Sequence, residues 1–459
     1  MTTRSLAEPI AEAASASALY RAVWRWHFYA GLLCLPFMIL LAVTGGLYLY
    51  KDEVNSLLYG DYLHVEPRSA TALPASDVIA RALEALPGTV GSYLPPAAPD
   101  ESATVAVTSE TLGQQRVYVD PYSGAVLGHL ADGGAARSPF MLVLRKIHSL
   151  DYFGWIANRV IELVAGWAVV LVVTGLYLWW PRQRAAGLLK IRSGVTKRAW
   201  WRDLHAVTGF YVALFILFLA LTGLPWSGFW GKNVNLYADQ VGLGYPPEFW
   251  NEVPKSAVPM QEAMTQTSWS LENAPMPLST PTGAAPIGID RAVALFDALG
   301  VHKGYTVDLP QGEDGVYSAS VFPDDVAFER IVHLDQYSGQ VLFDGGFGEL
   351  GAVGKAIEWG ISVHMGQEFG LLNQLVLTAA CFAIVAMAVS GAVMWWKRRP
   401  AGRLGAPPIP SHWGTLRNVL LLVLPLAVIF PLVGASLIVV LLLDLLVVQR
   451  IAPLRNALS

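Results

Sequence analysis

The sequence has 459 residues, of which 54% are hydrophobic and 14% are charged, and its formal net charge is −4. Soluble domains carry about 25% charged residues, so this composition indicates a membrane protein. The small net charge says nothing about nucleic acid, and the sequence has no basic face with interleaved aromatic residues that would suggest such a partner. The two cysteines, Cys34 and Cys381, lie in apolar runs and are too few for a disulfide framework, a zinc site or an iron–sulfur cluster.

Residues 1–26 are expected to form an N-terminal tail, of which 1–20 are Ala/Ser-rich and lack the apolar core of a cleavable signal. We therefore expect the first membrane helix to stay in the product. Four apolar runs then reach the length of about 20 residues that crosses a lipid bilayer. These predicted spans are 27–50, 159–180, 205–226 and 371–396. A further apolar segment, 417–459, contains Pro425 and Pro431 and predicts either one long kinked helix or a hairpin, and so one or two extra membrane helices.

Basic residues give the expected orientation in the membrane. The short loop 181–204 is dense in Lys and Arg, whereas the much longer segment 51–158 carries few for its length. Because cytoplasmic loops are enriched in Lys and Arg, we place this loop, the N-terminus and the loop 397–416 in the cytoplasm. Segments 51–158 and 227–370 are then expected to face the periplasm.

Both long segments contain the same strand–turn–strand pattern. Asp-x-Tyr-Ser-Gly stands between alternating apolar residues at 117–127 and again at 332–342, which predicts a hairpin in each segment. An amphipathic helix is predicted upstream of each hairpin, at 75–86 and at 290–299. Each segment is therefore expected to form a small α+β module. The aperiodic stretch 227–285 is expected to be an inserted loop that acts as a lid on the second module.

The order helix, extracytoplasmic module, helix occurs twice, which predicts a four-helix membrane core made by a parallel internal repeat about an axis along the membrane normal. Four histidines occupy matched positions in this repeat, each followed by a hydroxyl residue and a glycine at a fixed distance. The matched sets are His27 with Thr44-Gly45, His205 with Thr222-Gly223, His148 with Thr174-Gly175, and His364 with Ser390-Gly391. The spacing is 17 residues in the first two sets and 26 residues in the last two.

Matched imidazoles at the same depth can give one metal ion two axial ligands. The expected pairs are His27 with His205 near the cytoplasmic side and His148 with His364 near the outer side. Because no C-x-x-C-H motif is present, the pairs predict two non-covalent, b-type haems. For any one of these histidines, the alternative is an interfacial residue that caps a membrane helix.

Two kinds of neighbouring residue are expected to serve the haems. Gly31 and Gly209 follow the inner histidines by four residues and leave room on the same helical face for a flat macrocycle. Basic side chains beside the histidines can pair with haem propionates, the alternative being the ordinary basic flank of a membrane helix. These residues are Arg25 and Arg202 on the inner side and Arg145 and Lys146 on the outer side.

Two acids lie within apolar runs. Glu162 stands just inside the second span, where an ionisable side chain predicts a proton or redox-tuning role or, alternatively, an ion pair with Arg159. Asp444 has a similar standing in the last apolar run, but no motif surrounds it. Both roles stay open.

Together these residues resemble the PepSY-associated transmembrane family, which contains bacterial iron-uptake proteins of the inner membrane and di-haem siderophore reductases among them. The resemblance rests on Trp24-Arg25-Trp26-His27, on the two Asp-x-Tyr-Ser-Gly hairpins, and on His148 and His364 with the Trp-Trp pairs that follow them. It covers about residues 20–400 and leaves 417–459 outside. It implies PepSY-like modules, an inner-membrane location and a ferric siderophore as substrate.

The expected function is therefore a membrane oxidoreductase. Electrons enter at the inner haem and leave at the outer haem, where Fe(III) in the siderophore is reduced to Fe(II). The chain has no flavin or nicotinamide motif, so the donor must be external, either a quinol or a cytosolic flavoprotein. Two alternatives stay open: a haem reductase for another acceptor such as copper or a quinone, and a non-enzymatic membrane protein whose modules bind a peptide or protease.

Overall fold

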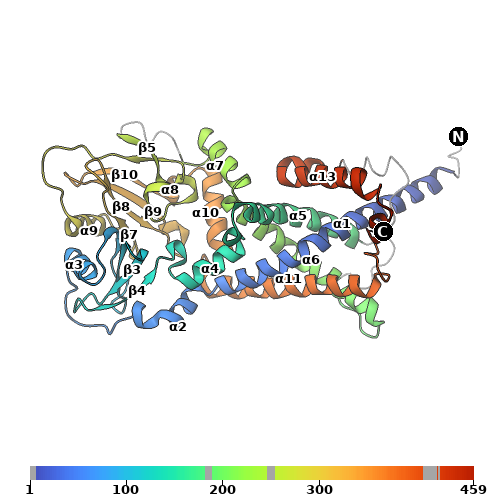
Figure 1. Ribbon diagram of the computed structural model, residues 1–459, viewed down its shortest axis with the longest axis horizontal. Coiled ribbons are helices and arrows are strands. Elements are labelled where there is room, and N and C mark those ends of the chain that lie inside the picture. Colours follow the sequence, from blue (N-terminus) through green and yellow to red (C-terminus); the bar gives the residue numbers. More distant parts are fainter. Residues whose placement is uncertain (1–6, 181–188, 246–253, 407–420, 422–423, 459) are drawn as a thin grey trace. The chain divides into compact units, whose positions relative to one another are not determined.

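The structure is a computed structural model that describes residues 7–180, 189–245, 254–406, 421 and 424–458, and the chain divides into two units (Figure 1). The helical unit comprises Met1–Gly46, His148–Trp230 and Val376–Ser459. The sheet unit comprises Leu47–Ile147 and Gly231–Leu375.

Four helices of the described chain are long and apolar enough to cross a membrane. They are α1 (Ala7–Tyr48), α5 (Trp155–Trp179), α6 (Lys197–Gly223) and α11 (Gly370–Arg398). The prediction of four spans is therefore confirmed, and the chain is a membrane protein. The stretch predicted as a tail over 1–26 is helical from Ala7 onward, because this Ala-rich segment has a high helix propensity and forms the first part of α1. α6 likewise begins in the basic loop, where the Thr196 hydroxyl accepts a hydrogen bond from the Ala199 amide.

Small residues let the helices of this unit approach one another. α5 has 50% of its apolar window buried, against 22–28% for the other three, so it is the central helix. One core cluster brings Ala42 of α1 and Ala168 of α5 together with Ala213 of α6 and Ile384 of α11. Close packing of small side chains is how membrane helices associate without a hydrophobic driving force.

The C-terminal region adds α13 (Pro431–Leu443), a π-helical turn (Asp444–Val448) and α14 (Ala452–Leu458). α13 packs on α5, where the Trp167 indole donates a 3.0 Å hydrogen bond to the Ser436 hydroxyl. With 13 residues, α13 is roughly 20 Å long, which is shorter than a bilayer core of about 30 Å. The prediction of one or two extra spans in 417–459 falls partly outside the described residues, and α13 by itself is too short to be one.

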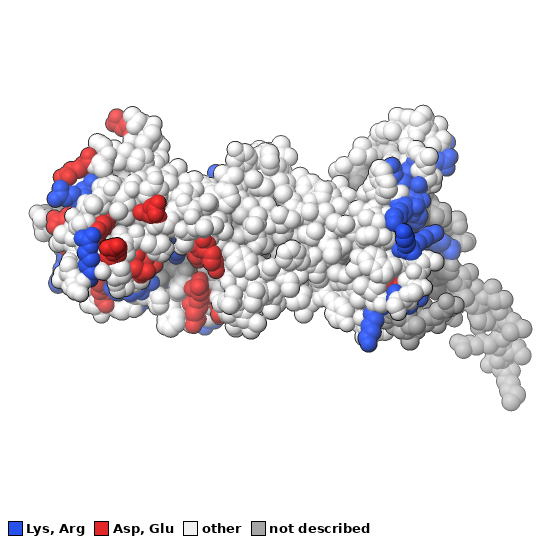
Figure 2. Space-filling view, turned by 90° about the horizontal axis from the view of Figure 1, so that it is seen from below, with Lys and Arg blue, Asp and Glu red and all other residues white. Residues whose placement is uncertain are grey.

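Charged side chains avoid the middle of the helical unit. Figure 2 shows a belt of uncharged surface along its helices, with Lys and Arg gathered at one end. Lys197 and Arg198 at the start of α6 and Lys397 at the end of α11 are exposed basic residues. An apolar belt next to a basic end is the surface expected of helices that cross a bilayer.

The sheet unit contains one antiparallel eight-stranded sheet in the order β10-β9-β8-β7-β1-β2-β3-β4. Its strands are β1 (Thr89–Leu94), β2 (Ala103–Ser109), β3 (Gly113–Val119), β4 (Val126–Ala131), β7 (Thr306–Asp308), β8 (Val316–Val321), β9 (Arg330–Asp335) and β10 (Val341–Gly346). The sequence predicts two separate modules, whereas here two four-stranded halves share one sheet through the pairing of Tyr93 in β1 with Val307 in β7. Because backbone hydrogen bonds hold β1 to β7, the pairing leaves no side-chain pattern from which it could be predicted.

Two helices cover the same face of the sheet, α3 (Ala75–Ala85) over the first half and α9 (Ile289–Ala298) over the second. They are the helices predicted at 75–86 and 290–299, and their ends differ from the prediction by one residue. The Ser76 amide and hydroxyl donate to the carboxylate of Asp290, at 2.9 and 2.6 Å, and so tie the two helices together. The two halves therefore share a helix layer as well as a sheet.

The Asp-x-Tyr-Ser-Gly segments form matching tight turns. The Asp120 carboxylate accepts hydrogen bonds from the Tyr122 amide at 2.8 Å and the Ser123 hydroxyl at 2.6 Å. Asp335 accepts the equivalent bonds from Tyr337 and Ser338. The glycines that follow have φ of +72° and +70°, a left-handed conformation that disfavours side chains, which explains why glycine closes both turns.

The prediction that 227–285 is a loop is wrong where the structure describes it. This stretch contains α7 (Trp230–Gln240), β5 (Lys255–Pro259), α8 (Met260–Ala263) and β6 (Pro275–Pro277). Residues 246–253 lie outside the described residues. Met260, Met264 and Leu271 bury themselves against Ile331 and Phe343 on the second face of the sheet. Apart from α7, these elements are too short to repeat a period, so their apolar residues look scattered in the sequence.

Three further α-helices lie wholly or mostly in the sheet unit. They are α2 (Lys51–Leu63), α4 (Pro139–His148) and α10 (Ala352–His364). α4 and α10 end at two of the four matched histidines. Each of these histidines therefore closes a short amphipathic helix that precedes a membrane span.

Candidate functional site

The structure brings the inner pair of matched histidines together. His27 lies on α1 and His205 on α6, and the centroids of their rings are 6.5 Å apart with an angle of 80° between the ring planes. Both rings are half-buried within the helical unit. The pairing that the sequence repeat predicts for these two residues therefore has a geometric counterpart.

Each of these two imidazoles is held through Nδ1 by a neighbouring helix. The Nδ1 atom of His27 lies 2.9 Å from the hydroxyl oxygen of Thr174 on α5. The Nδ1 atom of His205 lies 3.0 Å from the carbonyl oxygen of Met387 on α11 and 3.4 Å from the hydroxyl of Ser390. These contacts leave Nε2 of both rings for another partner.

His148 has the same kind of support. It ends α4 and is half-buried, and its Nδ1 atom lies 2.8 Å from the Thr44 hydroxyl on α1. Removal from water lowers the pKa of His148 to about 4, so the imidazole is neutral at pH 7. A neutral imidazole is the form that binds a metal.

A glycine next to each hydroxyl makes room for the ring. A Cβ atom on Gly175 would lie 3.2 Å from Cε1 of His27, and one on Gly391 would lie 3.3 Å from Cε1 of His205. A Cβ atom on Gly45 would lie 3.2 Å from Cε1 of His148. In the sequence these hydroxyl–glycine pairs served only as markers of spacing, and their contacts with the rings were not predicted. The signal was that such a pair recurs at a fixed distance after every matched histidine.

The fourth histidine, His364, is the last residue of α10 and belongs to the sheet unit, unlike the other three. Its pairing with His148 stays a prediction. The predicted spacer glycines are also less informative than expected. A Cβ atom on Gly31 would meet only Leu171 at 3.8 Å, and one on Gly209 only Met387 at 3.5 Å, both ordinary contacts.

The predicted propionate partners have contacts of their own. The Arg25 guanidinium lies 5.0 Å from the ring centroid of Tyr29. Arg202 donates to the Asp203 carboxylate at 3.0 Å. Arg145 and Lys146 lie on α4 in the sheet unit. Pairing of these four side chains with haem propionates stays a prediction.

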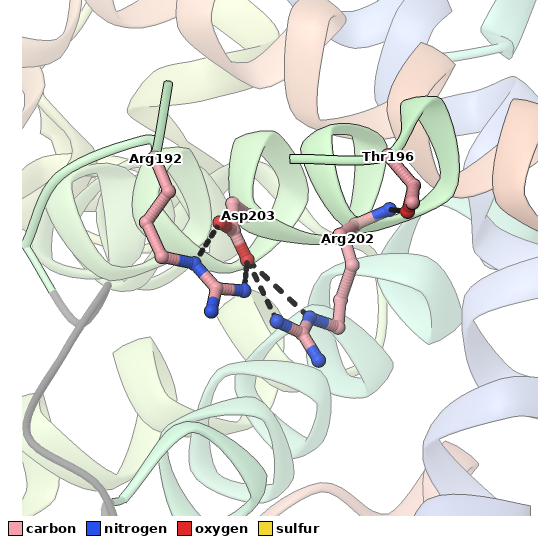
Figure 3. A network of polar contacts seen from close by, with 5 residues as sticks. Arg192, Thr196, Arg202 and Asp203 are labelled. Carbon is pink, nitrogen blue, oxygen red and sulfur yellow. Dashed lines mark hydrogen bonds and ion pairs between the residues drawn. The ribbon is translucent and has the colours of Figure 1, made fainter. Parts of the chain in front are cut away.

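Asp203 is a buried acid that the sequence reasoning missed. Its side chain is 4% exposed and lies two residues before His205. Arg192 contacts both of its oxygens, at 2.7 and 2.9 Å, and Arg202 shares one of them (Figure 3). Together with the Thr196 cap, this cluster fixes the beginning of α6 in place, and with it the helix that carries His205.

The two acids in apolar runs have separate surroundings. Glu162 is 6% exposed, and its carboxylate accepts hydrogen bonds from the amides of Phe229 at 3.0 Å and Trp230 at 2.8 Å, with Arg159 at 3.8 Å. Glu162 therefore holds the backbone in place where α7 begins. Of its two predicted roles, the ion pair with Arg159 has a contact in the structure, and the proton or redox-tuning role stays a prediction. Asp444 accepts a 3.1 Å hydrogen bond from Gln449.

Two carboxyls of the sheet unit are buried close together. Glu358 on α10 is 5% exposed and accepts a 3.2 Å hydrogen bond from the Ser270 amide. Burial raises the pKa of Glu358 to about 7, and the charge of Glu272 adds to this rise. Burial and the charge of Glu358 raise the pKa of Glu329 well above its ordinary value.

Replacing Glu358 by glutamine will change how stability depends on pH. Folding raises the pKa of the Glu358 carboxyl from 4.5 to about 7. The contribution of this carboxyl to stability is therefore fully present below pH 4.5 and is lost as the pH rises through 7. The melting temperature of Glu358→Gln should therefore exceed that of the wild type at pH 8 and approach it at pH 5. Glu66→Gln, at an exposed acid, serves as the control, and parallel melting curves for Glu358→Gln and wild type would contradict the buried acid.

Two imidazoles alone do not fill the coordination sphere of a metal ion. Within the described ranges, no group of three or more His, Cys, Asp or Glu side chains is placed to hold one. Two neighbouring imidazoles fit a metal whose remaining ligands come from a macrocycle, as in a haem with two axial histidines. The donor set of His27 and His205 is suited to that group.

Comparison with protein families decides where the chain belongs. A family profile described as the PepSY-associated TM region matches residues 24–398. The chain belongs to this family. The match begins just before His27 on α1 and ends at the last residue of α11, so the PepSY-associated region includes all four matched histidines and both long segments. A search of curated proteins found no match.

Proposed function

We propose that this PepSY-associated transmembrane protein carries two b-type haems and passes electrons across a bacterial inner membrane to a ferric siderophore. In this proposal the N-terminus and the basic ends of the spans face the cytoplasm, as the density of Lys and Arg suggests. His27 and His205 hold the inner haem. His148 and His364 hold the outer haem, and this second pair rests on the sequence repeat alone.

The spacing of His27 and His205 carries the proposal. A metal–imidazole bond is about 2 Å long, and the ring centre lies roughly 1 Å beyond the nitrogen, so two rings on one metal have centroids roughly 6 Å apart. The observed separation is 6.5 Å. Both Nδ1 atoms already have partners on other helices, which is the support that a metal-binding histidine needs from its surroundings.

The haem supplies one-electron chemistry when bound, alternating between its ferric and ferrous forms. The protein supplies the ligands, their orientation and a site among packed apolar helices. Ala22 and Val23, about one turn before His27 on α1, belong to a buried apolar cluster with Tyr177 of α5. A dry site of this kind favours electron exchange between fixed partners over side reactions with solvent.

The reaction needs one electron for each Fe(III) ion. A quinol or a reduced cytosolic flavoprotein gives up the electron on the inner side, and Fe(III) in the siderophore takes it up on the outer side and becomes Fe(II). A hard-oxygen chelator binds Fe(II) less tightly than Fe(III), so reduction releases the iron for uptake. The family match supports a membrane protein of this class, and the siderophore as acceptor follows from the family resemblance.

Haem content and acceptor specificity test the proposal. A pyridine haemochrome assay on purified protein should give two haems per chain, with b-type absorption. The dithionite-reduced protein should be reoxidised faster by ferric siderophores than by Cu(II) or by a quinone. One haem per chain would contradict the two-pair scheme. A haem-free protein would favour the non-enzymatic alternative, and faster reoxidation by Cu(II) or quinone would replace the siderophore as acceptor.

A further inference from the structure

We propose that the hydroxyl–glycine pairs beside the histidines are positioning residues that fix which ring nitrogen carries the proton. In this view Thr174-Gly175 and Thr44-Gly45 each hold an imidazole with hydrogen on Nδ1 and so leave the Nε2 lone pair for the metal. At Ser390-Gly391 the Met387 carbonyl, to which Ser390 also donates, is the acceptor for His205. The pairs thereby set haem affinity and reduction potential. This inference rests on the proposed function, because it assumes that the histidines bind haem.

The hydroxyl of Thr174 can only accept a hydrogen bond from His27. A threonine hydroxyl has a single hydrogen. Thr174 donates that hydrogen to the backbone carbonyl of Val170, one turn earlier in α5, at 2.7 Å. The 2.9 Å contact with His27 must therefore place the hydrogen on Nδ1 of the imidazole.

Thr44 repeats this arrangement in another helix. Its hydroxyl donates to the Leu40 carbonyl of α1 at 2.6 Å, and His148 approaches the same oxygen through Nδ1 at 2.8 Å. Thr222 on α6 donates to the Phe218 carbonyl in the same way, at 2.7 Å. The back-bonded hydroxyl is thus a recurrent feature of the residues that precede the matched glycines.

His205 reaches the same state through a different acceptor. A backbone carbonyl has no hydrogen to donate, so the 3.0 Å contact with the Met387 carbonyl also places the hydrogen on Nδ1. Ser390 donates to that same carbonyl at 2.7 Å, as the threonines do to theirs. His27, His148 and His205 therefore share one tautomer, with Nε2 as the free acceptor.

The glycine after each hydroxyl residue leaves the space that the imidazole ring occupies. A Cβ atom added at Gly175, Gly391 or Gly45 would lie only 3.2 to 3.3 Å from the ring Cε1 atom, so an alanine there would press on the ring. A hydrogen bond at Nδ1 makes the imidazole a stronger electron donor at Nε2. A stronger donor stabilises ferric over ferrous iron, so loss of the hydroxyl should raise the reduction potential of that haem and weaken its binding.

Paired substitutions at the two threonines test this inference. Thr174→Val removes the acceptor of His27 and should lower the affinity of the inner haem about 10- to 100-fold and raise its midpoint potential. Thr44→Val should do the same to the outer haem and leave the inner one unchanged, so each variant is the control for the other. Thr174→Ser keeps the hydroxyl and should behave as wild type. The measurements are haem content, redox titration of the absorption spectrum and the low-spin ferric electron paramagnetic resonance signal.

Gly175→Ala keeps the hydroxyl and provides a second variant in case Thr174→Val does not fold. It should displace the ring of His27 and alter the resonance signal of the inner haem only. Unchanged potentials in Thr174→Val, or equal shifts of both haems, would overturn the positioning role. A wild-type protein without haem would overturn the proposed function itself before any variant is compared.

Discussion

Replacing His27 by alanine will reduce the haem content from two per chain to one. His27 and His205 lie on different helices with their rings 6.5 Å apart, so loss of either ring leaves the inner metal with a single axial ligand. His205→Ala should therefore give the same spectrum as His27→Ala. The remaining haem should still be reduced by dithionite, because its proposed ligands are untouched.

His302→Ala is the matched control for this experiment. His302 is an exposed histidine of the sheet unit whose Nδ1 atom lies 2.8 Å from the neighbouring Lys303 carbonyl. Its replacement should leave both haems in place. If His27→Ala and His205→Ala keep two haems, or if they lose different haems, the pairing of these two residues is wrong.

Replacing His364 by alanine will abolish electron transfer to an external ferric siderophore while the inner haem remains reducible. The last carrier before the outer surface would be lost, whereas His27, His205 and their supporting hydroxyls lie in the helical unit and are unaffected. In oriented vesicles a donor on the inner side should still reduce the inner haem. The rate of Fe(II) formation outside should fall to that of protein-free vesicles.

The contrast with His27→Ala gives this experiment its direction. His27→Ala should block electron entry and leave an outer haem that only an external reductant can reach. Retention of both haems and of full siderophore reduction in His364→Ala would show that His364 is not the outer ligand. Equal behaviour of the two variants would contradict transfer from the inner to the outer side.

The membrane helices could be predicted from the sequence because a long apolar run is a strong signal by itself. Their ends could not. Lys197 to Arg202 are too polar for a bilayer, yet they continue α6, because Thr196 caps the helix and Asp203 binds Arg192 and Arg202. Hydropathy reports where a helix leaves the membrane and not where its hydrogen bonds end.

The candidate site was predicted in part. Matched spacing predicted that His27 and His205 lie near each other, since a repeat places equivalent residues at equivalent depth, and their ring centroids are 6.5 Å apart. It did not show that Thr174 holds His27, because that contact depends on how α1 and α5 are rotated against each other, which residue spacing does not encode. The arginine–aspartate cluster at the start of α6 was missed because Asp203 looks like one more polar residue in a charged loop.

The eight-stranded sheet that the two halves share has a consequence for how the protein is made. β1 lies in the interior of the sheet, but its neighbour β7 is formed by Thr306–Asp308, far along the chain. At about 5–20 residues per second, the ribosome needs roughly 10–40 s to go from β1 to β7. Throughout that interval β1 is an unpaired edge that another strand could capture. Slow synthesis between the two halves should therefore favour aggregation of the nascent chain. The exposed edge of β1 is covered only when β7, three residues long, pairs with it.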